Sequence, residues 1–117
     1  MIQHQILEEK VKAVLAKAGL PIASTYDASL SVGAFLEVAD DEKLPPEVFL
    51  KWRVHSTLHA HFRSVQHDRL EGDPLVMEMV NAEQAMNVAI ASILKFSGFN
   101  VRMARGERVG EMVISEP

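Results

Sequence analysis

The stretch EGDPLVMEMVNAEQAMNVAIASILKFSG, residues 71–98, contains the start, the apolar repeat and the end of one long helix. Asp73 is a typical N-cap residue, and Pro74 suits the first helical position because the first turn needs no donor from it. Gly98 is a typical end, since glycine readily adopts the left-handed conformation that closes a last turn. We therefore predict a helix over residues 74–97.

Apolar residues recur along this helix in alternating steps of four and three. They are Leu75, Met79, Ala82, Met86, Ala89, Ile93 and Phe96. Such a repeat is the a/d seam through which one helix packs against another. Further apolar residues lie off the seam, a pattern typical of a central helix.

Residues 46–70 predict a second long helix, for which Pro45 and Pro46 form a suitable start. The connection between the two helices is only the corner EGDP, so we expect them to be antiparallel neighbours. An amphipathic pattern over residues 3–18 predicts a further, N-terminal helix.

Residues 24–40 fit two structures. Ser24 and Asp27 have the spacing of a helix capping box. Alternating apolar residues from Leu30 to Val38 instead favour a strand, with only Phe35 on the other face. The strand is the preferred interpretation and the helix the alternative.

The C-terminal residues predict a β-hairpin, in which Val101 and Met103 alternate with Arg102, Gly106 supplies the turn and residues 109–114 return. Residues 1–117 therefore predict a single, mostly helical α+β domain. It comprises a long antiparallel helix pair, an N-terminal helix and a small C-terminal β-hairpin, which a strand from residues 24–40 would extend to three strands. The alternative is a helical bundle with a terminal hairpin.

Composition narrows the classes of function. The chain has no cysteine, which excludes disulfides and thiolate chemistry. Its formal net charge of −4 argues against general attraction to nucleic acid or to an anionic membrane. No apolar run is long enough for a membrane span, and no signal-peptide pattern begins the chain. We expect a cytoplasmic protein.

Four of the five histidines lie within RVHSTLHAHFRSVQH, residues 53–67. On a helix, His55 and His59 are one turn apart and face the same way, which is a spacing that can chelate a divalent transition metal. The favoured interpretation is that they bond to neighbouring groups on a half-buried face and that the protein has no cofactor. Trp52 nearby could anchor a partner, although aromatic residues at helical spacing are usually core.

Arg102, Arg105 and Arg108 surround the turn of the predicted hairpin. The predicted order of elements is that of a winged helix, whose hairpin contacts the DNA backbone. The preceding helix carries acids and no base before Lys95, which opposes phosphate binding. The alternative is a charged edge hairpin that resists aggregation.

We find no phosphate-binding glycine loop, nucleophile motif or paired acidic motif, so catalysis is not favoured. The preferred hypothesis is a small regulatory or interaction protein, homo-oligomeric, that binds a protein partner through its helical hairpin and charged flanks. The alternatives are a DNA-binding regulator that uses the arginine hairpin and a metal or small-ligand protein that uses His55 and His59.

Overall fold

The computed structural model describes residues 2–23, 32–38, 45–54, 61, 64, 65, 69, 72–108 and 110–117. The elements, in chain order, are α1 (Ile2–Lys17), β1 (Gly33–Val38), β2 (Glu47–Arg53), α3 (Pro74–Phe96), β3 (Asn100–Met103), the 3-10 turn η2 (Gly106–Arg108) and β4 (Met112–Ser115). The molecule measures 42 × 29 × 25 Å along its principal axes.

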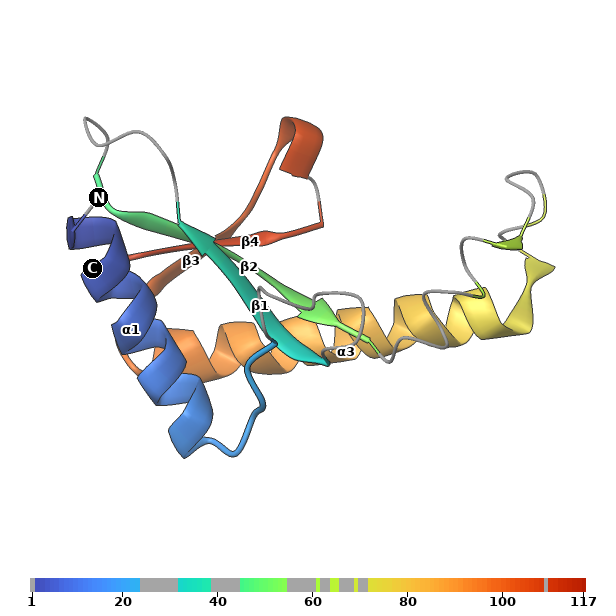
Figure 1. Cartoon of the computed structure of the whole chain (residues 1–117), viewed down its shortest axis with the longest axis horizontal. Helices are drawn as coiled ribbons and strands as arrows, with labels where there is room; N and C mark the ends of the chain where they lie inside the picture. The colour runs from blue at the N-terminus through green and yellow to red at the C-terminus, as the bar shows by residue number, and fades with distance from the viewer. Residues whose placement is uncertain are drawn as a thin grey trace.

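The four strands form one antiparallel sheet in the order β1-β2-β4-β3. Each half of the chain therefore contributes one unit, a helix followed by two strands, and β2 and β4 pair where the units meet. We name them the first unit (α1-β1-β2) and the second unit (α3-β3-β4). The helix α1 packs on β1 and β2, whereas α3 packs on β2, β3 and α1 (Figure 1).

The predicted antiparallel helix pair is wrong. Glu47–Arg53 is strand β2 rather than the start of a helix, and β2 pairs with β1 and β4. Val48 and Leu50 are buried while Glu47, Phe49 and Lys51, which alternate with them, are only half-buried, which is the period of two that a strand requires. Most of the remaining predicted helix, up to residue 70, lies outside the described residues.

The helical-bundle alternative and the three-stranded sheet are likewise wrong, because β2 lies between β1 and the terminal hairpin. Helices and an antiparallel sheet are nevertheless both present, which is compatible with the α+β class. The helices α1 and α3, the strand at Gly33–Val38 and the β3–β4 hairpin confirm the corresponding predictions.

The core lies between the two helices and one face of the sheet. Leu36, Leu50 and Met112 are register neighbours on three adjacent strands, and all three are buried. The helices complete the cluster with Leu7, Val11, Leu15, Ile90 and Leu94. Because residues of both helices join this cluster, α1 and α3 cover the same face of the sheet.

The buried His4 joins α1 to β2. Its side chain is only 2% exposed, and its Nδ1 accepts a hydrogen bond from the backbone N–H of Glu47 at 3.2 Å. A buried polar side chain needs such a partner, since an unsatisfied one costs free energy. This bond fixes the start of β2 beside the first turn of α1.

The outer edge of β1 is covered by the chain that follows α1. Ala34 donates its N–H to the carbonyl oxygen of Pro21 (2.9 Å), and Ala23 donates its N–H to Ala34 (2.8 Å). Gly33 makes this approach possible, because a Cβ there would lie 2.8 Å from the carbonyl carbon of Pro21. Its φ of +132° also favours glycine.

The predicted a/d seam of α3 does not face the core. The buried residues of α3 are Val76, Met79, Ile90 and Leu94, so Met79 alone belongs to both sets. The seam is rotated to the side of the helix, and α3 is a surface helix rather than a central one. No helix in the described ranges is long and apolar enough to cross a membrane.

Candidate functional site

One flank of α3 leaves apolar side chains uncovered. Leu75 is 43% exposed and Phe96 is 97% exposed, at the two ends of the seam. Ala89 is also exposed, whereas Ala91 packs against the core. Since successive helical residues are about 100° apart, Ala89 and Ala91 lie on opposite flanks of α3. The seam therefore lies along the open flank, where Leu75, Ala89 and Phe96 are exposed. Ala82, Met86 and Ile93 are half-buried there, and Met79 is buried.

Strand β3 borders this open flank, because α1 covers the β1 side of the sheet and α3 contacts β3. Val101 packs against the core, so Met103, two residues later, also lies on the helix side of the strand. Met103 is nevertheless 56% exposed. We name the seam residues and Met103 together the α3–β3 flank.

The outer face of the sheet, which is turned away from the helices, carries a different chemistry. The side chains there alternate with those of the core. They are Phe35, Glu37, Glu47, Phe49, Lys51, Arg53, Arg102 and Val113.

Two arginines stack on the phenylalanines of this face. Arg53 Cζ lies 4.3 Å from the centroid of the Phe35 ring, and Arg108 Cζ lies 4.2 Å from that of Phe49. Lys51 Nζ is 5.7 Å from the Phe35 centroid. Phe35 does not fit the apolar alternation of its strand. Its ring lies on the outer face, where Arg53 is its partner.

Carboxylates bind the arginines at the edges of these stacks. Arg108 donates to Glu37 at 3.1 Å and to Glu111 at 3.3 Å. The pKa of Arg108 is raised above its ordinary value, and the main cause is the hydrogen bond to Glu37. Arg102 donates to Glu47 at 2.7 Å.

The three predicted hairpin arginines are therefore not a separate wing. Arg102 and Arg108 are bonded to acids of the sheet, and Arg105 lies exposed between β3 and η2. The winged-helix order is wrong, because the strand β2 stands where the second helix of that fold would begin.

Trp52 lies opposite Ala34 on the helix side of the sheet and packs against the core, so its core interpretation is the one that the contacts support. His55 and His59 lie outside the described residues, and the metal site there stays a prediction. Within the described residues, no group of three side chains could hold a metal ion.

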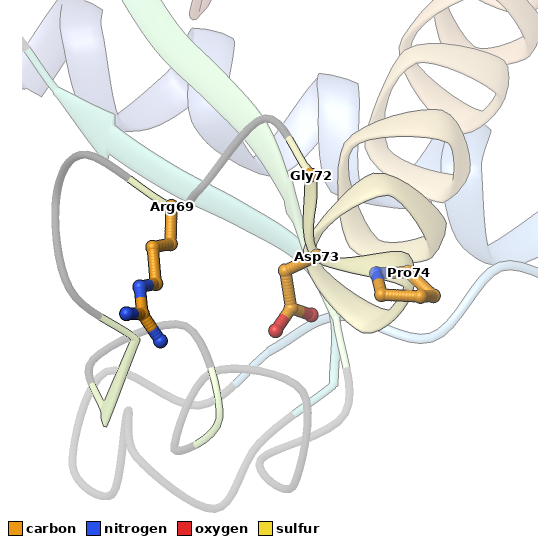
Figure 2. A pocket seen from close by; sticks show the side chains of 4 residues that line it. All are labelled: Arg69, Gly72, Asp73 and Pro74. Atoms are coloured by element: carbon orange, nitrogen blue, oxygen red, sulfur yellow. The ribbon is translucent and has the colours of Figure 1, made fainter.

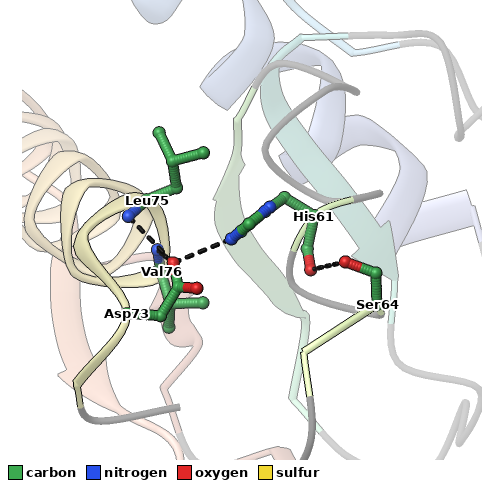
Figure 3. A network of polar contacts seen from close by, with 5 residues as sticks. All are labelled: His61, Ser64, Asp73, Leu75 and Val76. Atoms are coloured by element: carbon green, nitrogen blue, oxygen red, sulfur yellow. Dashed lines mark hydrogen bonds and ion pairs between the residues drawn. The ribbon is translucent and has the colours of Figure 1, made fainter. Parts of the chain in front are cut away.

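His61 and Asp73 form the polar contact at the start of α3 (Figure 3). His61 Nε2 and Asp73 Oδ1 are 2.8 Å apart. The same carboxylate oxygen accepts from the N–H groups of Leu75 (2.9 Å) and Val76 (3.1 Å). The Val76 N–H is the largest cause that lowers the pKa of Asp73; partial desolvation opposes it, and His61 adds to the lowering.

An open hollow of about 390 Å³ adjoins this cap and is lined by Arg69, Gly72, Asp73 and Pro74. Figure 2 shows the side chains of Arg69 and Asp73 directed into the same space from opposite sides. The volume falls within the range of small-molecule sites. The Asp73 carboxylate is already occupied by the helix cap, which is sufficient to explain its position.

The sequence does not predict this outer face, because residues 46–70 are interpreted there as a helix. On a helix, Lys51 points away from Phe49 and Arg53, whereas on a strand all three share one face. The alternation in EVFLKWR was the signal that could have found them. Their partners Phe35 and Glu37 become visible only through the β1–β2 register.

Comparison with protein-family models, with curated proteins and with solved structures found no significant match to this chain.

Proposed function

We propose that the protein is a homodimeric interaction protein whose two copies meet through the α3–β3 flank. The observation that carries the proposal is the heptad seam, which ends in a Phe96 side chain that is 97% exposed. A heptad repeat of which Leu75, Ala89 and Phe96 stay exposed fits a second helix of the same pattern. The second copy of this chain has that pattern by definition.

A single two-fold axis can cover both open features of the flank. β3 is an edge strand with β4 as its sheet neighbour. A two-fold axis beside β3 pairs it antiparallel with β3 of the second copy, which is how exposed edges are commonly satisfied. The same axis places the two α3 helices antiparallel on one side of the extended sheet, and Met103 between them. Such a self-complementary contact is typical of closed dimers.

Two neighbouring exposed positions provide the test. Ala89→Asp places a charge in the middle of the seam, whereas Val88→Asp places the same charge at a 69% exposed position off the seam. We expect the wild-type chain and Val88→Asp to sediment as dimers at tens of micromolar, and Ala89→Asp to sediment as a monomer. A monomeric wild-type chain, or equal effects of both substitutions, would overturn the proposal.

A further inference from the structure

The two phenylalanine–arginine stacks lie side by side on the outer face of the sheet. In the β1–β2 register Phe35 is opposite Lys51, and Phe49 is opposite Glu37. The two rings are therefore diagonal neighbours, which are about 7–8 Å apart in a sheet. Each guanidinium covers one ring, and a guanidinium plane can itself take a flat partner. The side chain of Arg108 is 37% exposed.

From this geometry we infer that the outer face of the sheet binds single-stranded nucleic acid, with successive bases stacked on the Phe35–Arg53 and Phe49–Arg108 platforms. An open antiparallel sheet whose aromatic side chains stack two or three unpaired bases is an established mode of single-strand recognition. The ligand class follows from the combination of flat platforms with cations at their edges.

The cations of the face suit the phosphates of such a strand. Lys51, Arg53, Arg102 and Arg108 all lie on or over it, and the side chain of Arg102 is 61% exposed. Each arginine has five N–H donors. The ion pair with Glu47 therefore leaves Arg102 with donors for a phosphate oxygen.

The carboxylates on the face oppose the phosphates, and this makes the binding modest. Glu37, Glu47 and Glu111 all contact arginines there. These ion pairs are partly exposed, with Arg102 at 61% and Glu37 at 42% side-chain exposure, so a phosphate can compete for the arginine donors on the solvent side. Neutralising the acids should consequently strengthen binding rather than weaken it.

An unpaired strand fits this face better than a duplex does. The helices α1 and α3 lie on the opposite side of the sheet, so neither of these two can enter a groove from the outer face. The net charge of −4 gives no general attraction to a duplex. Stacking, in contrast, requires bases that are free of their partners.

The test is fluorescence anisotropy with labelled oligo-uridine and oligo-thymidine strands of about ten nucleotides, at low salt, with the duplex of each as a comparison. We expect saturable binding of at least one single strand and tenfold or more weaker binding of the duplexes. Arg53→Gln and Arg108→Gln should each weaken binding by about tenfold, the effect of losing one stacked base. Phe35→Leu, which keeps the apolar bulk but removes the ring, should do the same.

Matched variants distinguish binding at this face from general electrostatic attraction to the protein. Lys12→Gln and Lys17→Gln remove charges from α1, on the other side of the sheet, and should leave the affinity unchanged. Glu37→Gln should increase it. Thermal unfolding of every variant checks that the fold persists.

Three results would overturn the inference: no saturable binding by the wild-type chain, equal losses with the α1 lysine variants, or equal competition by polyglutamate. The monomeric Ala89→Asp variant should bind with the wild-type affinity per chain. This separates the inference from the proposed dimer.

Discussion

The two units of the molecule share one topology but close their surfaces differently. In the first unit, α1 has 16 residues and buries Leu7, Val11 and Leu15 on the sheet. In the second unit, α3 has 23 residues and extends past the end of the sheet (Figure 1). The edge of β1 is covered by Pro21–Ala23, whereas β3 has no such cover among the described residues. The second unit therefore carries the α3–β3 flank and the strand edge that the described residues leave uncovered.

The difference begins directly after the helices, which end in the same way. Gly19 and Gly98 have φ values of +85° and +98°, and Leu20 and Phe99 each donate an N–H to a carbonyl five residues earlier at 3.0 Å. In the first unit Pro21 then follows, and proline has no N–H for a strand ladder. In the second unit the chain continues into β3.

The largest expected difference between the units comes from their leucines. Leu15 is fully buried, so Leu15→Ala should destabilise the protein by about 2–5 kcal/mol through lost burial and a cavity. Leu75 is 43% exposed, so Leu75→Ala should lower the free energy of unfolding by less than about 1 kcal/mol. Urea unfolding of both variants measures the contrast, and equal losses would contradict it.

Opening the covered edge of the first unit should be the next largest effect. Gly33→Ala forces a side chain against the carbonyl of Pro21 at a φ of +132°. We expect a loss of about 1–3 kcal/mol. Thermal unfolding measures it, with Gly110→Ala as the control because a Cβ there meets no atom within 4 Å although its φ is also positive. A loss no larger than that of Gly110→Ala would show that contact with Pro21 does not matter.

Arg108 tests the connection between the units, since it follows β3 in the second unit and contacts Phe49 and Glu37 of the first. Arg108→Ala should destabilise the protein by about 1 kcal/mol, through loss of the stacking contact and of a partly exposed ion pair. Arg105→Ala is the exposed comparison in the same connection and should be nearly neutral. Chemical unfolding of the two variants at equal salt would reveal whether they differ.

The smallest effect concerns Glu83, which is half-buried on α3. Desolvation raises its pKa above the ordinary 4.5, and the charge of Lys51 opposes this. The ionised carboxylate is thus penalised in the folded state, and the penalty is relieved as the pH falls through the raised pKa. Glu83→Gln should be slightly more stable than wild type at pH 7, by less than about 1 kcal/mol. The difference should vanish below pH 4.5; if it persists there, charge is not its cause.

The sequence predicts α1 and α3 correctly because the signals at their ends are local. Asp73 accepts from Leu75 and Val76, as its position before Pro74 predicts. β2 was missed because Val48 and Trp52 can share a helical arc, and only pairing with β1 and β4 decides between the two periods. The sequence places Arg102 and Arg108 in the terminal hairpin, but their partners Glu47 and Glu37 are distant in the chain and depend on strand register.

The pairing of β2 with β4 also bears on how the chain reaches this structure. The β1–β2 and β3–β4 ladders join residues that are close in sequence, whereas β2–β4 joins Glu47 to Ser115 and Leu50 to Met112. Contacts between such distant segments must first overcome the entropy of closing the intervening loop. We therefore expect the two hairpins to form early and the central ladder to limit the folding rate. Val48 and Ile114 face each other across that ladder. Substitutions there should show, from the folding and unfolding rates, whether a loss of stability slows folding or speeds unfolding.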